Sequence, residues 1–255
     1  MGLEPYATAE ALKPSMAIRR RTPPVAKSRP DEVEVGEVRA PSIAPVERKR
    51  LDLLLARELA LYSEGMTRIA GVDEAGVGPL AGPVVAAAVI LPPGLGIAGV
   101  NDSKKLSFAR RQTLAVEIRR CAIAWAVSRV EPEEIDRINI YQASLQAMRR
   151  AVLALEEQPD FILVDARRIP GVTVRQESII GGDARCHAIA AASILAKTAR
   201  DAIMAEYEDQ FPGYGFAGHK GYPTDTHREA ILRLGPCPIH RKSFRLLAQA
   251  RLDGW

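Results

Sequence analysis

Residues 69–91, IAGVDEAGVGPLAGPVVAAAVIL, decide the fold, because they hold two short apolar segments on either side of a glycine-rich loop. Apolar runs of this length, bounded by glycine and proline, are typical of buried strands. The longer run, 84–91, is far shorter than the roughly 20 residues of a membrane-spanning helix, so the sequence does not indicate a membrane protein. The stretch predicts two consecutive strands, with two adjacent acids, Asp73 and Glu74, where the first one ends.

Helices and further strands are expected on both sides of this stretch. Leucines at helical spacing predict an N-terminal helix over 47–65, and we expect residues 66–255 to form the main domain. Three more strands are predicted from short apolar segments, at 122–130, 161–166 and 172–180. Further helices are predicted at 107–121, 132–155, 186–211 and from residue 224 onward. Strands that first follow one another and then alternate with helices predict an α/β fold with a mixed, largely buried sheet flanked by helices.

The composition is that of an ordinary globular protein with a small basic excess. With 255 residues and 47% hydrophobic content, the chain can form one compact domain and an appendage. Seven of the 18 prolines lie in residues 1–46, which lack a periodic apolar pattern and which we expect to be disordered. Three cysteines without a CxxC pair indicate neither a zinc site nor a disulfide framework, and a reducing, cytoplasmic setting is expected. The formal net charge of +4 permits a polyanionic partner without indicating one.

Three acids follow apolar strand candidates, and each is a candidate metal ligand. Asp73 ends the segment RIAGVD, Asp165 ends FILVD, and Asp183 follows SIIGG. Ligand clefts of α/β sheets form at strand ends, and a buried carboxylate is costly unless it is paired, hydrogen-bonded or bound to metal. Each acid alone is more often the cap of a turn or helix. Together, oxygen ligands without histidine or thiolate favour Mg²⁺ or Mn²⁺ over zinc.

The loop after the first two acids is expected to bend the chain. Adjacent strand residues point to opposite faces of a sheet, so Asp73 and Glu74 can share one site only if the chain leaves the extended conformation there, which Gly76 would allow. The glycines lack the spacing of a dinucleotide fingerprint, and the Gly-Lys-Ser/Thr of a Walker loop is absent. What remains is exposed backbone N–H groups beside a metal site, which could hold a phosphodiester or a sugar hydroxyl.

With these motifs in place, the chain resembles ribonuclease HII, the bacterial type 2 ribonuclease H. The resemblance covers residues 49–244 and rests on ordered blocks, which read IAGVDEAGVGPLAGPVVAAAVIL, NDSKKLS, EPEEIDRINI, FILVDA, GGDARCHAIAAASILAKTARD, YGFAGHKGYPTDTH and PIHRKSF. It implies a ribonuclease H-like fold, which is a five-stranded mixed sheet with helices on both sides. A C-terminal helical section would follow.

The resemblance implies four catalytic, metal-binding acids, which fall on Asp73, Glu74, Asp165 and Asp183. They would bind two divalent ions, Mg²⁺ or Mn²⁺, that activate a water and stabilise the leaving 3′-oxygen. The implied substrates are RNA–DNA hybrids and duplex DNA containing ribonucleotides, cut on the 5′ side of a ribonucleotide to leave a 3′-hydroxyl and a 5′-phosphate. Asp201 matches a further family acid and is assigned a supporting metal role, although Lys197 and Asp201 could equally form an i,i+4 surface pair.

The resemblance also implies residues that read the substrate. Tyr222 resembles a tyrosine that packs on the sugar after the ribonucleotide, and its loop setting argues against a core tyrosine. The main chain of Gly76, Val77 and Gly78 would contact the 2′-hydroxyl. A phosphate grip is implied for four residues of the NDSKK motif, although lysines near a turn are more often only solvated: Asn101, Ser103, Lys104 and Lys105. No chemical role is predicted for His187, His219 or His240.

The glycine loop departs from the family at one residue. The family's loop reads Gly-Arg-Gly, whereas this chain has Val77 between Gly76 and Gly78. The main-chain contacts survive this change, but a guanidinium that would contact phosphate is lost, and such a contact contributes about 1–3 kcal/mol when it is charge-assisted. We therefore predict retained chemistry with weaker or altered substrate binding.

Two alternatives remain open. Ribonuclease HIII has the same fold and acids but prefers longer RNA tracts, and it carries an N-terminal nucleic-acid-binding domain that residues 1–46 do not resemble. The other is a non-catalytic hybrid-binding module, against which the four acids argue. A cytoplasmic monomer acting in ribonucleotide excision repair and DNA replication is expected. The terminal residues Gln249, Leu252 and Trp255 loosely resemble a sliding-clamp-binding peptide, although a frayed helix end is the simpler interpretation.

Overall fold

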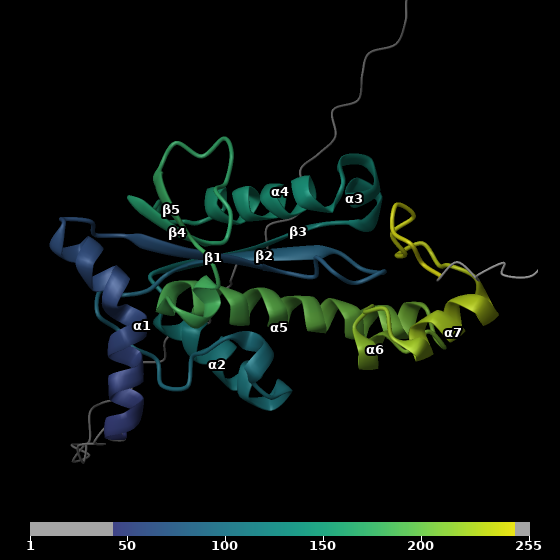
Figure 1. Ribbon diagram of the computed structural model, residues 1–255, viewed down its shortest axis with the longest axis horizontal. Helices are drawn as coiled ribbons and strands as arrows, with labels where there is room; N and C mark the ends of the chain where they lie inside the picture. Colours follow the sequence, from purple (N-terminus) through teal and green to yellow (C-terminus); the bar gives the residue numbers. More distant parts are fainter. Residues whose placement is uncertain (1–42, 248–255) are drawn as a thin grey trace, which may run out of the picture. The chain divides into compact units, whose positions relative to one another are not determined.

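A five-stranded mixed sheet forms the centre of the protein (Figure 1). The computed structural model describes residues 43–247. The strands are β1 (Ile69–Ala75), β2 (Val84–Ile90), β3 (Ala124–Val130), β4 (Phe161–Asp165) and β5 (Arg175–Ile179), in the order β3-β2-β1-β4-β5. The first three strands pair antiparallel, whereas β4 and β5 run parallel to β1. The predicted mixed sheet is confirmed, and β1 runs two residues further than the sequence indicated.

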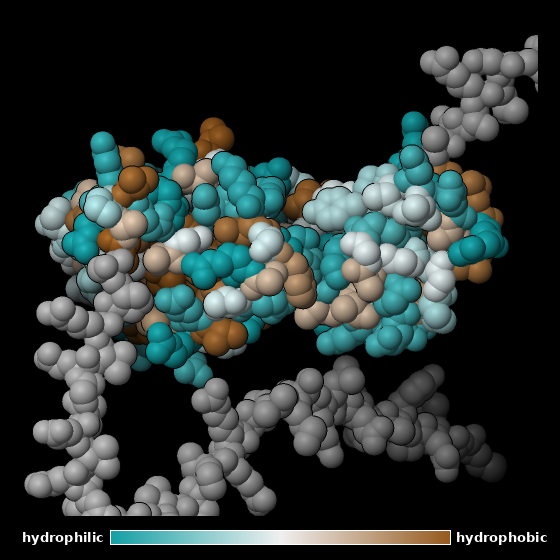
Figure 2. All heavy atoms as spheres, turned by 90° about the horizontal axis from the view of Figure 1, so that it is seen from below, coloured by the Kyte–Doolittle hydropathy of each residue, from teal (hydrophilic) through white to brown (hydrophobic). Residues whose placement is uncertain are grey.

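Helices cover both faces of the sheet (Figure 1). One face carries α3 (Pro132–Ile138) and α4 (Ile140–Leu153), and the other carries α2 (Phe108–Cys121) and α5 (His187–Gln210). Three helices adjoin α5: α1 (Pro45–Ser63), α6 (Phe216–His219) and α7 (Asp225–Leu234). None of the helices in the described residues is long and apolar enough to cross a membrane. Figure 2 views the side of α2 and α5, where hydrophobic residues lie in small groups among hydrophilic ones.

Small side chains in the central strands let the helices pack closely on the sheet. All of β2 is buried, and its alanines alternate between the two apolar clusters, with Ala86 facing α4 and Ala87 facing α5. The closest approach is at Gly71 of β1, where an added Cβ would lie 2.1 Å from the carbonyl carbon of Ala188. Only glycine permits this contact. It fixes the position where α5 crosses β1, two residues before Asp73.

The predicted helix over 132–155 is wrong as a single element, because the chain breaks at Asn139 into α3 and α4. Asn139 has a φ of 68° and a ψ of 162°, a strained conformation that is adopted almost only by glycine and that ends α3. Its side-chain oxygen accepts a hydrogen bond from the Gln142 N–H at 3.1 Å and so caps α4. Ile135 and Met148 still bury into one cluster, which explains why the apolar pattern continued across the break.

Two expectations fall mainly or wholly outside the described residues. Of residues 1–46, which were predicted to be disordered, residues 1–42 lie outside the described part of the chain. The clamp-binding resemblance concerns Gln249, Leu252 and Trp255, all beyond residue 247. Both stay predictions.

A buried carboxylate from α1 caps the start of α5. Glu58 is 3% exposed, and its Oε1 accepts hydrogen bonds from the Ala188 N–H at 2.8 Å and the Cys186 thiol at 3.4 Å. Burial raises the pKa of Glu58 to about 7 despite these contacts. A carboxylate at a helix N-terminus is favoured by the helix dipole, but this one loses most of its hydration. Glu58 therefore ties α1 to α5, with its charged form disfavoured by burial.

We expect Glu58→Gln to stabilise the protein above neutral pH. A carboxyl whose folded pKa is raised from 4.5 to about 7 makes the free energy of unfolding fall as pH rises through that window, by about 3 kcal/mol in total. Glutamine keeps an acceptor for the Ala188 N–H and removes this loss. Thermal unfolding at pH 8 and pH 4.5 should show the gain at the higher pH only.

Glu64→Gln, at the exposed end of the same helix, is the matched control and should change little at either pH. A lower melting temperature for Glu58→Gln at pH 8 would mean that the attraction of the charge to the α5 N-terminus outweighs its burial.

Candidate active site

The two adjacent acids lie on the last residues of β1. The strand continues through Asp73 and Glu74 to Ala75, and both acids are still paired with β2. The chain turns only at Gly76, which has a φ of 98°. The expectation that the extended conformation ends at the acids is therefore wrong.

As strand neighbours, these acids point to opposite faces of the sheet. Asp73 lies on the face covered by α5, where the Ser193 hydroxyl lies near its carboxylate. Glu74 lies on the face of α4, near the hydroxyl of Ser144. Both serines are buried, and sequence reasoning missed them because a serine within an apolar helix carries no signal of its own. The two carboxylates still lie close enough for the charge of Glu74 to raise the pKa of Asp73, because both are near the end of the strand.

Asp165 and Asp183 approach from the parallel side of the sheet. Asp165 directly follows Val164, the last residue of β4 that pairs with β1, which places it level with Asp73. Its Oδ1 accepts a hydrogen bond at 2.7 Å from the N–H of Gly182, in the turn Gly182–Ala184 that also carries Asp183. The structure thus brings four of the predicted acids to one end of the sheet.

Burial and mutual repulsion raise the pKa of three of these acids. The pKa of Asp73 is raised well above its usual value, first by burial and then by the charge of Glu74. Burial and the charge of Asp165 raise the pKa of Glu74, and burial raises that of Asp165 despite its hydrogen bond. The Oε2 atom of Glu74 is buried without a hydrogen-bond partner among residues 43–247. Anions held together in this way are stabilised by a nearby cation.

The donor set suits divalent cations that bind oxygen. All four side chains are carboxylates, which is the ligand chemistry of Mg²⁺ and Mn²⁺. As they stand, no three acidic, histidine or cysteine side chains in the described part of the chain are grouped closely enough to hold an ion. Binding would therefore require the carboxylates to turn toward the ion. The unpartnered Glu74 oxygen and the raised pKa values fit such a cation.

The NDSKK motif places one lysine at the acids. It forms the short turn Ser103–Lys105, in which the Ser103 hydroxyl is hydrogen-bonded to that of Ser193 at 2.9 Å. This contact ties the turn to α5. Lys104 Nζ donates a hydrogen bond to Asp183 Oδ2 at 3.2 Å, while most of the lysine side chain stays exposed.

The other members of the motif either stabilise the turn or lie exposed on the surface. Asn101 accepts a hydrogen bond from the Asp102 N–H at 2.8 Å and shapes the turn. Lys105 is exposed, without a hydrogen bond or ion pair from its side chain within residues 43–247. Of the four positions predicted to grip phosphate, only Lys104 and Lys105 offer accessible charge, whereas Asn101 and Ser103 hold the turn.

The glycine loop, residues 76–83, begins immediately after these acids. Gly78 is exposed, and Val77 is partly buried with its side chain packed against the apolar cluster on the α4 face. Phe244, which follows α7, packs against the same cluster. Val77 thus serves as a packing residue.

Tyr222 borders the glycine loop. An ideal Cβ on Gly78 would lie 3.8 Å from its Cε1 atom, and the ring is exposed, as a tyrosine outside the core would be. Two cations flank it, with Lys197 Nζ 5.9 Å and the Arg200 guanidinium carbon 5.8 Å from the ring centroid. Tyr222 also lines a hollow together with the exposed ring of Phe108. The loop that carries it, residues 219–224, is called the tyrosine loop below.

Asp201 is not brought together with the other acids. Its two oxygens accept hydrogen bonds from Lys197 at 2.6 Å and Arg111 at 3.2 Å, and the residue is 2% exposed. It follows Ser193 by eight residues on α5, which is about 12 Å along a helix axis. The pair with Lys197 is therefore real but buried, and Asp201 holds two cations near Tyr222.

Arg167 is a further charged residue at the acids that sequence reasoning missed. It follows Asp165 after a turn in which Ala166 has a φ of 55°. Its guanidinium carbon lies 4.9 Å from the centroid of the Tyr141 ring at the start of α4. The charge of Arg167 lowers the pKa of Glu74 and of Asp165, partly offsetting burial. A cation two residues after a strand-ending acid was the available signal.

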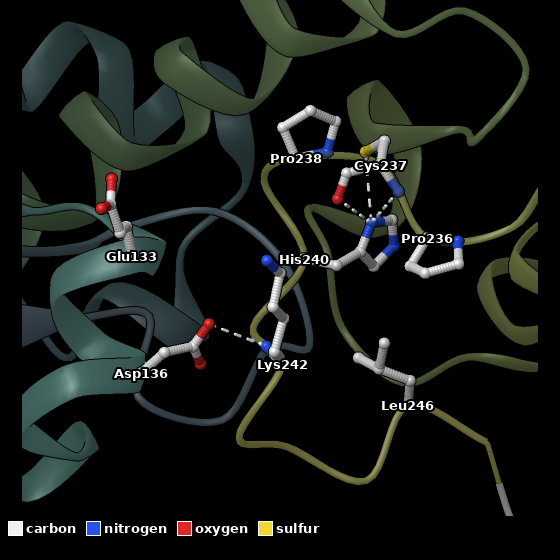
Figure 3. A pocket seen from close by; sticks show the side chains of 8 residues that line it. All are labelled: Glu133, Asp136, Pro236, Cys237, Pro238, His240, Lys242 and Leu246. Atoms are coloured by element: carbon white, nitrogen blue, oxygen red, sulfur yellow. Dashed lines mark hydrogen bonds between the residues drawn. The ribbon is translucent and has the colours of Figure 1, made fainter.

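Three histidines, His219, His227 and His240, form a largely buried network that contacts the tyrosine loop. His227 Nδ1 lies 2.9 Å from the Tyr222 carbonyl oxygen, and its Nε2 lies 3.1 Å from His240 Nε2. His219 stacks on His227 with ring centroids 4.3 Å apart. Figure 3 shows His240 bonded to Cys237 at the wall of a cavity. Burial lowers the pKa of His227 to about 4, so this ring is neutral at physiological pH and acts as scaffold.

Known proteins resemble this chain over the same region. A family model described as Ribonuclease HII matches residues 70–247. The Ribonuclease HII of Moorella thermoacetica is 57% identical over 199 residues, which cover 78% of this chain and 97% of the relative. The ribonuclease H2 structure from Pyrococcus horikoshii has a TM-score of 0.60 at 26% identity, covering 70% of this chain and 94% of that one. The structure of the PCNA:RNase HII complex from Archaeoglobus fulgidus has a TM-score of 0.59 at 28% identity, covering 73% and 98%.

Carboxylates gathered at the end of such a sheet, on a ribonuclease H-like fold, define a metal-dependent nuclease. The match over residues 70–247 narrows the class, and the chain belongs to the ribonuclease HII family. The resemblance predicted from the sequence is confirmed. The protein is a ribonuclease H, a hydrolase that depends on divalent metal ions and acts on RNA in RNA–DNA hybrids.

We expect Asp165→Asn to separate the repulsion among the acids from their affinity for metal. Without divalent ions, the loss of one charge should raise the melting temperature by a few degrees. A ligand at 100 times its dissociation constant stabilises a protein by about 2.7 kcal/mol, so excess Mg²⁺ should raise the melting temperature of the parent. The variant should lose most of that increase.

Differential scanning calorimetry with and without Mg²⁺ measures both effects. Asp209→Asn, at the exposed end of α5, is the control and should leave both unchanged. An equal Mg²⁺ response in Asp165→Asn and the parent would contradict a metal site at Asp165.

Proposed function

We propose that the protein cuts duplex DNA at single embedded ribonucleotides, and that it also cuts RNA strands in hybrids. The cut would lie on the 5′ side of the ribonucleotide and leave a 3′-hydroxyl and a 5′-phosphate. The observation that carries this proposal is the meeting of Asp73 and Asp165 at one end of the sheet, with the glycine loop and Tyr222 beside it. A loop of exposed backbone next to a ring that can pack on a sugar suits recognition of a single ribose.

Two divalent ions, Mg²⁺ or Mn²⁺, are the proposed cofactors. Their proposed ligands are Asp73, Glu74, Asp165 and Asp183. Such a pair of ions activates the attacking water and stabilises the leaving 3′-oxygen. For Asp201 we propose a supporting role that is indirect, because its oxygens already hold Lys197 and Arg111.

The chain's own residues orient the substrate around these acids. Lys104 lies against Asp183 with an exposed side chain, which suits contact with a phosphate of the strand to be cut. The N–H of exposed Gly78 is proposed to contact the 2′-hydroxyl, and the Tyr222 ring to pack on the next sugar. Lys197 beside that ring suits the phosphate that follows.

The proposal extends to partners and cellular setting. A sliding clamp would bind Gln249, Leu252 and Trp255, and the solved archaeal complex with PCNA supports the idea by analogy. A cytoplasmic monomer acting in ribonucleotide excision repair and DNA replication suits the substrate. A preference for longer RNA tracts, as in ribonuclease HIII, is the second candidate function.

A cleavage assay on three labelled duplexes tests the proposal: DNA with one ribonucleotide, DNA with a four-ribonucleotide tract, and a full hybrid. Mg²⁺- or Mn²⁺-dependent cutting of the first duplex, with a 3′-hydroxyl at the product end, is expected. Asp73→Asn should abolish cutting while substrate binding persists. Cutting of tracts alone would favour the second candidate, and binding without cutting by the parent would contradict the proposed activity.

We expect Val77→Arg to strengthen substrate binding. A guanidinium reaching phosphate would lower KM by about tenfold and increase the salt dependence of binding by about one unit of slope. Steady-state kinetics at several salt concentrations measure both. Val77→Met adds length without charge and should do neither. Unchanged KM and salt slope in Val77→Arg would show that position 77 does not reach the substrate.

A further inference from the structure

Two arginines lie fully buried beneath the glycine loop. Arg200 on α5 and Arg241 after α7 are each 0% exposed, and within residues 43–247 neither forms an ion pair with an acid. Burial lowers the pKa of Arg200 to about 10 and that of Arg241 to about 9, so both stay charged at neutral pH. A buried charge without a counter-charge is costly unless hydrogen bonds satisfy it. What the two guanidinium groups bind therefore indicates why they are buried.

Arg241 binds three main-chain carbonyl oxygens of the glycine loop. Its Nη2 donates to Gly76 at 2.6 Å, its Nη1 to Val77 at 3.0 Å and its Nε to Gly82 at 2.9 Å. These partners lie about 160 residues away along the chain. The planar, five-donor fork of arginine can satisfy several oxygens at once, which the single ammonium of lysine cannot match.

Arg200 joins the glycine loop to the tyrosine loop. Its Nε donates to the carbonyl oxygen of Pro83 at 3.0 Å and its Nη2 to that of Ala81 at 3.1 Å. Its Nη1 donates to the carbonyl oxygen of Lys220, two residues before Tyr222, at 3.0 Å. The same guanidinium lies 5.8 Å from the centroid of the Tyr222 ring. One side chain thus touches both loops that are proposed to read the substrate.

The carbonyl contacts set the direction of the opposite peptide groups. In a trans peptide the C=O of one residue and the N–H of the next point in opposite directions. With the carbonyls of Gly76 and Val77 turned in toward Arg241, the N–H groups of Val77 and Gly78 turn away from it. Neither N–H donates a hydrogen bond within the described residues. They are therefore free to meet a substrate oxygen.

We propose that Arg200 and Arg241 are positioning residues that hold the glycine loop and the tyrosine loop as one ribose-reading unit. The inference rests on the proposed function and adds the elements that fix the two loops at a set separation. Recognition of an embedded ribonucleotide depends on this separation, because one loop meets the ribose and the other meets the next sugar. The metal-binding acids lie on β1, β4 and the turn after β5, so their chemistry does not depend on these guanidinium groups.

Arg241→Lys and Arg200→Lys test the proposal, because each keeps the charge and removes the fork. KM for a duplex with one ribonucleotide should rise by about tenfold in each variant, the equivalent of one or two lost hydrogen bonds. The kcat value and the Mg²⁺ concentration for half-maximal rate should change far less. Binding to DNA duplexes with and without one ribonucleotide, measured in Ca²⁺, should show a reduced preference for the ribonucleotide.

The matched control is Arg228→Lys, since the Arg228 side chain also donates to a main-chain carbonyl, that of Leu246, but forms no hydrogen bond with either loop. It should leave KM and the binding preference unchanged. Thermal unfolding of every variant shows whether it is folded at the assay temperature. If a variant is unfolded there, the other arginine's variant carries the test, and Arg241→Gln, which keeps a planar donor, gives a third.

Three results would overturn the inference: an unchanged binding preference in both lysine variants, a fall in kcat with KM unchanged, or a shifted Mg²⁺ requirement. A loss of stability alone would lower the active fraction and kcat for every substrate equally, without changing the preference. Measurements on the unmodified protein distinguish a failure of this inference from a failure of the proposed function. A parent that neither cuts nor prefers the ribonucleotide duplex refutes the proposed function, whereas a parent that does both, with variants that keep the preference, refutes only the role of the arginines.

Discussion

The active end of the sheet depends on how closely α5 lies against β1. Gly71 lets the α5 backbone approach to a distance that any Cβ would block, and this contact sets the helix beside the strand that carries the first acids. Parallel pairing of β1 with β4 then places Asp165 level with Asp73. The turn Ser103–Lys105 is anchored on the same helix through Ser193. A shift of α5 would therefore disturb both its packing on β1 and the turn that carries Lys104.

The same arrangement concentrates charge that the fold does not neutralise. Asp73 and Glu74 lie near Asp165, and all three are wholly or partly shielded from solvent. Burial raises the pKa of each. Lys104 and Arg167 only partly offset this. With the divalent ions proposed for these acids, such a site would lower the stability of the metal-free protein in exchange for binding cations, which is the common relation between stability and function. Around it, the histidine network and the buried arginines form a polar scaffold that satisfies main-chain groups.

Much of the fold follows from local sequence pattern, and the exceptions have identifiable physical causes. The first four strands were predictable because each is a short, mostly apolar run bounded by turn residues, whereas β5, which reads RQESI, was indicated only by the apolar residues next to it. The break at Asn139 was not predictable, because a positive φ leaves no mark on the apolar spacing. Asp73, Asp165 and Asp183 were singled out because each follows an apolar strand candidate, and parallel pairing of β1 with β4 places two of them at the same level. Arg200 and Arg241 were missed because an arginine in sequence reads as surface charge, and only tertiary contacts reveal that its partners are distant carbonyls. The pair of Asp201 with Lys197 was predictable from the i,i+4 spacing, whereas its burial and its second partner, Arg111, were not.

The opposite orientation of Asp73 and Glu74 has a consequence for how a duplex approaches. A phosphate that meets both carboxylates has to arrive along the strand axis, end-on to the sheet, because an approach over either face would reach one acid and be blocked by α4 or α5 from the other. The double helix would then lie across the end of the sheet. Lys104 would contact it from the α5 side and Arg167, on its platform of Tyr141, from the α4 side. The end of the sheet that carries the acids would thus have one cation on each side.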